Sequence, residues 1–312
     1  MLCSDVGRRR FLHQAAGVGL AAAGALGWSS AVIGEESSSG EPLPTIPLGK
    51  MRVTRLIVGG NPIGGFSYGT PKLTRHMLGY FTAERTSEFL RHCETQGITT
   101  FQCNYSPVVR AALLAARERG SRMQFILLAS DFEKGVPKEM LEMAPIAICH
   151  HGGVTDKLLR SGKGQVVHDF VKRVHDAGFL AGVSTHNPDH LARVEDSGWE
   201  NDFYMTCFYN LTRTSEELQE IVRQPTVDEW HFFAQDPERM TKRIHEVKKP
   251  CLAFKILAAG RLCGDAETLD KAFAFAYRNI KPMDAVIVGM YPVFSDEARE
   301  DAQLARKHGK LV

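Results

Sequence analysis

Eight short apolar runs, each followed by a stretch with helical spacing of apolar residues, constrain the fold of this chain most strongly. The runs are nearly continuous in apolar residues, which is typical of parallel strands buried on both faces. Eight strand–helix units predict an α/β fold, namely a closed (β/α)8 barrel of the TIM type. The predicted strands are 56–60, 99–104, 124–130, 146–150, 180–185, 203–208, 252–257 and 285–289.

A doubly wound open sheet is the alternative architecture. It is less favoured because no GxGxxG pattern follows the first strand. Helix starts are marked by residues whose side chains cap a first turn, two of them followed by proline. The predicted caps are Asn187, Asp236, Asp265 and Ser295.

The first 31 residues resemble a twin-arginine export signal. Arg8 and Arg9 precede Phe11 and Leu12, and an Ala/Gly-rich stretch follows that is too short and too weakly apolar for a membrane span. A basic start to an ordinary buried helix is the alternative. The signal implies the export machinery as a partner, a periplasmic location and no stable membrane span after cleavage. Residues 32–46 are polar and rich in Ser and Pro, which predicts a linker before a barrel over 47–312.

Charge and cysteine content exclude several classes of protein. The formal charge is +2, and removal of residues 1–31 leaves 35 basic and 35 acidic side chains. A balanced surface gives no reason to expect nucleic acid as a partner. The seven cysteines include no CxxC pair, so neither a disulfide framework nor a zinc ribbon is indicated.

Six segments, in order, resemble the aldo-keto reductases over residues 47–312. They are LGKMRVTRLIVGGNPIGG, GITTFQCNY, HDAGFLAGVSTHNPDHL, FYNLTR, FKILAAGRL and AVIVGMYPVFSDEA. The resemblance implies a short N-terminal hairpin that closes the barrel floor. It also implies an NAD(P)-dependent oxidoreductase acting on a small carbonyl or sugar-like substrate.

The family's catalytic set is only partly present. Its histidine position, at the end of the fourth strand, is occupied by His150, with His151 as the candidate if the register slips by one. Gln102 stands where the family has an aspartate, and Tyr105 is the nearest candidate for the catalytic tyrosine. The end of the third strand has no lysine, so the cation that lowers a tyrosine pKa is missing there.

The resemblance also implies a nicotinamide site, with NADP or NAD as the cofactor. Ser184 and Asn187 follow the fifth strand, and Tyr209 follows the sixth, where an aromatic ring stacks on the nicotinamide. The small residues after the seventh strand are expected to admit a pyrophosphate. The implied cofactor residues are Ser184, Asn187, Tyr209, Ala259, Gly260, Arg261 and Arg299.

Lys255 lies within the predicted seventh strand, where an unpaired ammonium is costly to bury. It can supply the missing cation, form a Schiff base, or pair structurally with a carboxylate such as Asp131. A second alternative places His150, His151 and His186 around a metal ion, but no HxH or HExxH spacing supports it, and no metal is predicted.

Two further expectations concern function. The connection 224–233 is expected to be a packed surface strand, with a lid over the barrel mouth as the alternative. The altered catalytic set leaves two rivals to the reductase open. One is a cofactor-free barrel acting as a metal- or lysine-dependent lyase, isomerase or hydrolase, and the other is a non-catalytic binding protein.

Overall fold

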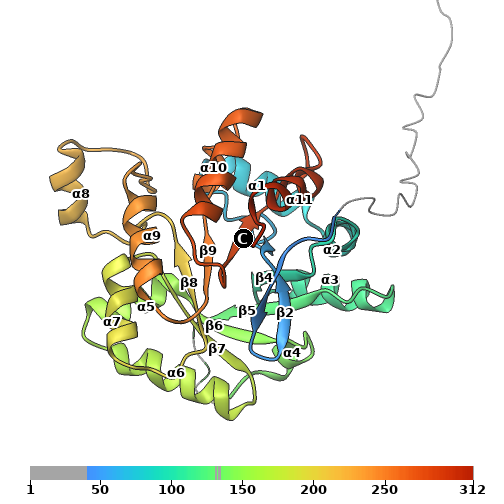
Figure 1. The fold of residues 1–312 in the computed structure, drawn as a ribbon, viewed down its shortest axis with the longest axis horizontal. Helices are drawn as coiled ribbons and strands as arrows, with labels where there is room; N and C mark the ends of the chain where they lie inside the picture. Colours follow the sequence, from blue (N-terminus) through green and yellow to red (C-terminus); the bar gives the residue numbers. More distant parts are fainter. Residues whose placement is uncertain (1–40, 131, 133–134, 312) are drawn as a thin grey trace, which may run out of the picture. The chain divides into compact units, whose positions relative to one another are not determined.

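A computed structural model describes residues 41–130, 132 and 135–311. Eight parallel strands form a closed barrel in the order β10-β3-β4-β5-β6-β7-β8-β9 (Figure 1). Their bounds are β3 Leu56–Gly59, β4 Thr100–Asn104, β5 Gln124–Ala129, β6 Ala147–His150, β7 Leu180–Thr185, β8 Phe203–Cys207, β9 Cys251–Phe254 and β10 Ala285–Gly289. All eight predicted strands are therefore confirmed. The open-sheet alternative is wrong, because β10 pairs with β3 and closes the sheet.

An antiparallel hairpin of β1 (Thr45–Leu48) and β2 (Met51–Thr54) precedes the barrel. Its buried side chains Ile46, Leu48 and Val53 join the apolar cluster that fills the barrel interior. The predicted floor hairpin is thus present. Leu43 and Ile46 fall within the predicted linker 32–46 but are buried, so the packed chain begins before residue 47.

Helices surround the barrel, and a larger apolar cluster fills the layer between them and the strands (Figure 1). The helices are α1 Pro71–Tyr80, α2 Ala83–Thr95, α3 Pro107–Glu118, α4 Lys138–Leu141, α5 Gly152–Arg160, α6 Gly164–Asp176, α7 Pro188–Asp196, α8 Ser215–Val222, α9 Asp236–Glu246, α10 Ala266–Arg278 and α11 Glu297–His308. Within the described chain, no helix has the length and apolar character needed to cross a bilayer.

The predicted caps are confirmed at two helices and corrected at two others. The side chains of Asn187 and Asp265 accept hydrogen bonds from the first turns of α7 and α10. Asp296, and not Ser295, caps α11. Asp236 is the first residue of α9, and its carboxylate is used elsewhere.

Side chains alternate between the two apolar clusters along each strand, as the pleat requires. In β6, Cys149 belongs to the interior cluster and Ile148 to the outer one. In β9, Leu252 lies inside, whereas Cys251 and Ala253 lie outside. This alternation decides which residue at each strand end faces the barrel mouth. The predicted signal at residues 1–31 lies outside the described residues.

Candidate active site at the barrel mouth

The two histidines at the end of β6 lie on opposite sides of the barrel wall. His150 is fully buried, with its Nδ1 2.7 Å from the Thr155 hydroxyl and its ring edge packed on Phe170 of α6. This placement in the helix layer corrects the expectation that His150 orients the substrate. His151 falls on the interior side of the alternation and is the residue that faces the mouth.

His151 is held in an environment that favours its neutral form. Burial lowers the pKa of His151, and the nearby His186 and Lys255 lower it further. Its Nδ1 is buried and has no hydrogen-bond partner among the described residues. A neutral imidazole with an unused nitrogen is suited to hydrogen bonding with a ligand.

Asp156, on α5, is the buried centre of a hydrogen-bond network that the sequence analysis missed. One carboxylate oxygen accepts from the Nδ1 and backbone N–H of His186, at 3.0 and 2.9 Å. The other lies 2.8 Å from the Nδ1 of His190. The Thr185 hydroxyl donates to this second oxygen, and the Thr212 hydroxyl donates to the oxygen that His186 contacts. One sequence signal was available, since Asp156 shares the spacing of the buried α5 residues Gly152, Thr155 and Leu159.

The network fixes both the charge of Asp156 and the tautomer of His186. Burial acts to raise the pKa of Asp156, but hydrogen bonds from His186, His190 and Thr185 outweigh it and hold the pKa below its usual range. The ionised carboxylate only accepts, so the Nδ1 of His186 carries a proton. The Nε2 of His186 is then the basic nitrogen.

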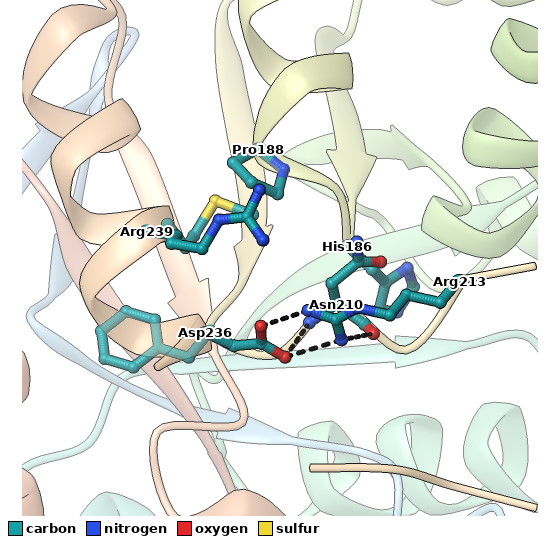
Figure 2. Close-up of a pocket in the computed structure, with 8 residues that line it drawn as sticks. His186, Pro188, Asn210, Arg213, Asp236 and Arg239 are labelled. Carbon is teal, nitrogen blue, oxygen red and sulfur yellow. Dashed lines mark hydrogen bonds and ion pairs between the residues drawn. The ribbon is translucent and has the colours of Figure 1, made fainter. Parts of the chain in front are cut away.

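His186 lines a narrow pocket at the mouth with Pro188, Phe208, Asn210, Arg213, Asp236, Arg239 and Met240. Figure 2 shows Arg213 and Asp236 pointing toward each other beside His186 and Asn210. Arg213 donates to both Asp236 oxygens and to the Asn210 carbonyl, so its charge is neutralised and its position fixed. Arg239 is exposed and forms no salt bridge with the described residues.

Connections that follow three different strands meet over the mouth. Tyr68, after β3, packs edge-on against Trp230, and Phe232 packs against Tyr209 after β8, each pair with ring centres 5.0 Å apart. Arg261, after β9, lies 4.1 Å over the Phe232 ring and donates to the Tyr68 carbonyl. The expected surface strand over 224–233 is wrong, because these residues form no strand. Two of them, Trp230 and Phe232, pack on Tyr68 and Tyr209, and the lid alternative stays a prediction.

Lys255 does not lie within a strand, as was expected, but follows the last residue of β9. Its φ of 61° turns the chain away from the strand path. Its predicted partner Asp131 lies outside the described residues.

Gln102 is buried in β4, and Tyr105 packs half-buried against the cluster between strands and helices. No contact in the described structure joins Tyr105 to a lysine.

The residues expected to hold a dinucleotide have the following places in this structure. Asn187 caps α7, and Arg261 is engaged with Tyr68. Arg299 is a largely exposed residue of α11 and lies 3.8 Å from Asp296. Ser184 and Tyr209 are buried, and Ala259 and Gly260 form a left-handed turn. The pocket beside His186 is too narrow in this conformation to admit a water molecule, so it does not hold a dinucleotide as it stands.

The three histidines proposed as alternative metal ligands, His150, His151 and His186, do not converge on one point. His150 points into the helix layer, and the Nδ1 of His186 is bonded to Asp156. Across the described parts of the chain, no group of three His, Cys, Asp or Glu side chains is placed to hold a metal ion.

No protein-family model and no curated protein matches the chain. Solved structures of similar fold include the glycerol dehydrogenase AKR11B4 from Gluconobacter oxydans, at 11% identity and a TM-score of 0.47, covering 86% of this chain and 97% of that one. The aldo-keto reductase AKR11C1 from Bacillus halodurans is similar at 10% identity and a TM-score of 0.46, covering 86% and 95%.

A truncated 3-deoxy-D-arabino-heptulosonate 7-phosphate synthase from Thermotoga maritima is similar at the same level. It has 11% identity and a TM-score of 0.47, covering 85% of this chain and 90% of that one. Aldo-keto reductases are thus among the solved barrels similar to this chain, beside an enzyme of a different reaction. At these identities and scores the likeness carries no argument about activity.

Proposed function

We propose that the protein is an enzyme that transfers protons on a small carbonyl or sugar-like substrate at the barrel mouth, with His186 as the acid–base residue. The observation that supports this most directly is the hydrogen bond from the His186 Nδ1 to the buried carboxylate of Asp156, in a residue that lines a pocket. Active sites of such barrels lie at this carboxyl end of the strands.

The chemistry follows from the fixed tautomer. The Nε2 of His186 removes a proton from the carbon beside a carbonyl, and the ionised Asp156 stabilises the imidazolium that forms. The neutral His151 hydrogen-bonds the substrate oxygen. Returning the proton to the neighbouring carbon, while the hydroxyl proton of that carbon passes to the former carbonyl oxygen, completes an aldose–ketose isomerisation. Arg213 is held by Asp236 and shapes the pocket wall.

The proposal is tested by proton exchange and not by a cofactor signal. Aldoses and ketoses are incubated with the protein in D2O, and loss of the α-proton is followed by NMR. His186→Gln should slow exchange by about 10²–10⁴-fold, the usual contribution of a positioned acid–base group. His245→Gln, at an exposed histidine of α9, is the matched control. Equal exchange rates in wild type and His186→Gln would contradict the proposal.

A nicotinamide-dependent reductase is the second candidate. It is supported by Ser184 and Tyr209, which are buried at the ends of the adjacent strands β7 and β8, where the resemblance expects the nicotinamide. Binding would require the connection 224–233 to move, since Phe232 packs on Tyr209.

This candidate predicts saturable binding of NADH or NADPH, measured by protein fluorescence. Tyr209→Ala should weaken it by roughly 1–3 kcal/mol, the cost of losing a stacked ring in a site. The matched variant Tyr204→Phe, at a buried tyrosine of β8 that bonds Glu195, should leave the affinity unchanged. If neither nucleotide binds, the nicotinamide-dependent reductase is ruled out as the function.

A further inference from the structure

Lys255 is a charged side chain held at the mouth without a carboxylate partner among the described residues. Only 9% of the residue is exposed. Its Nζ lies 3.7 Å from the centre of the Tyr68 ring and 5.3 Å from that of Phe254. A buried ammonium without an anion is costly, and contact with two aromatic faces offsets only part of that cost.

The other charged groups near Lys255 do not supply the missing anion. Burial keeps both His151 and Cys207 neutral, since it lowers the pKa of His151 and raises the pKa of the Cys207 thiol, and the charge of Lys255 does not ionise either group. The buried carboxylates Asp156 and Asp236 are already used, since Asp156 holds two histidines and Asp236 holds Arg213. Arg261 adds a second cation, which donates to the carbonyl of Tyr68.

The backbone is bent in an uncommon way to place this ammonium. Lys255 has a φ of 61° and Tyr68, which covers it, has a φ of 53°. Left-handed conformations are unfavourable for side chains other than glycine and gather at ligand clamps. By alternation from Phe254, an extended Lys255 would face the helix layer. The turn, closed by a hydrogen bond from the Ala258 N–H to the Lys255 carbonyl, brings it over the mouth instead.

We propose that Lys255 binds an oxyanion of the substrate, a carboxylate or a phosphate, so that the enzyme acts on acidic sugar derivatives and not on neutral sugars. The statement that the oxyanion belongs to the substrate rests on the proposed function, whereas the oxyanion site itself depends only on Lys255. The oxyanion takes the place of the Tyr68 ring above the ammonium. Phosphate and carboxylate share the required chemistry, and separate probes distinguish them.

The test is a calorimetric titration of the full chain with inorganic phosphate, with D-gluconate and with neutral D-glucose. Wild type should bind at least one of the two anions saturably and not glucose. Lys255→Met should weaken anion binding by at least about 10-fold, as expected for loss of one partner of a buried charge pair. Lys255→Arg should retain most of the binding. The exposed Lys172→Met on α6 is the matched control and should behave as wild type.

The outcomes separate this inference from the proposed function. His186→Gln should bind the anion as wild type does even though its proton exchange is slow. Saturable anion binding that is equal in wild type and Lys255→Met would overturn the inference, and so would absence of anion binding by wild type. Circular dichroism of each variant shows whether the barrel has folded. If Lys255→Met is unfolded, the pair Lys255→Arg and Lys255→Gln decides by the same comparison.

Discussion

Asp156 accepts hydrogen bonds from side chains of β7, of α7 and of the connections that follow β7 and β8, so a single buried carboxylate holds these elements together. Three of its partners, His186, His190 and Thr212, lie 30, 34 and 56 residues further along the chain. Removing one partner of such a buried network leaves the others unsatisfied. Asp156→Asn should therefore destabilise the fold by about 2–4 kcal/mol, measured by urea denaturation at neutral pH.

The pH dependence of that loss has a definite sign. The folded-state pKa of Asp156 lies below its unfolded value, so its stabilisation is present above the unfolded pKa of about 3.9 and is lost as the pH falls through the folded pKa. The difference between wild type and Asp156→Asn should thus shrink in acid. Asp176→Asn, at an exposed carboxylate of α6, should show neither effect. A constant difference down to the acid limit would contradict this account.

At the scale of elements, the connection between α8 and α9 is held at the mouth by a few aromatic contacts. It does not take part in the packing of helices against strands. Trp230 packs on Tyr68, and Phe232 lies between Tyr209 and Arg261. Elements with few buried contacts open at low free energy. Trp230→Ala should change the unfolding free energy by less than about 1.5 kcal/mol but speed proteolysis within 224–233 several-fold.

Trp199→Ala provides the comparison for that experiment. Trp199 stacks on His168 of α6, with the two ring planes 5° apart, and makes no ring contact with the described residues of 224–233. Its loss should lower global stability without opening 224–233. Limited proteolysis followed by mass mapping of the cut sites separates the two variants. Identical cleavage patterns would mean that Trp230 does not hold the connection closed.

For the whole molecule, we propose that the barrel is exported in the folded state. A closed barrel joins its first and last strands, and Arg55 donates to carbonyls of Asp284 and Gly309 near the other end of the chain, so the fold is complete only when the full chain has emerged. Arg8→Lys with Arg9→Lys should leave the protein in the cytoplasm with its signal uncleaved, since the twin-arginine receptor recognises both residues. Lys50→Arg is the matched control. The location of each variant is measured by cell fractionation and immunoblotting. Normal export of the double variant would contradict the proposal.

The sequence by itself determined the barrel, because strand burial and helix caps are local properties. The eight apolar runs became the eight strands with ends shifted by a few residues, and Asn187 caps α7 as its following proline indicates. The floor hairpin was also predictable, through the resemblance of its segment.

Only the tertiary structure decided the site, because its contacts depend on steps of one residue and on distant strand ends. One position in the alternation of β6 places His150 in the helix layer and His151 at the mouth. One left-handed residue turns Lys255 off the path of β9. Asp156 could not be assigned its partners from sequence, since the pairing of the neighbouring strands β6, β7 and β8 brings His186, His190 and Thr212 to one carboxylate.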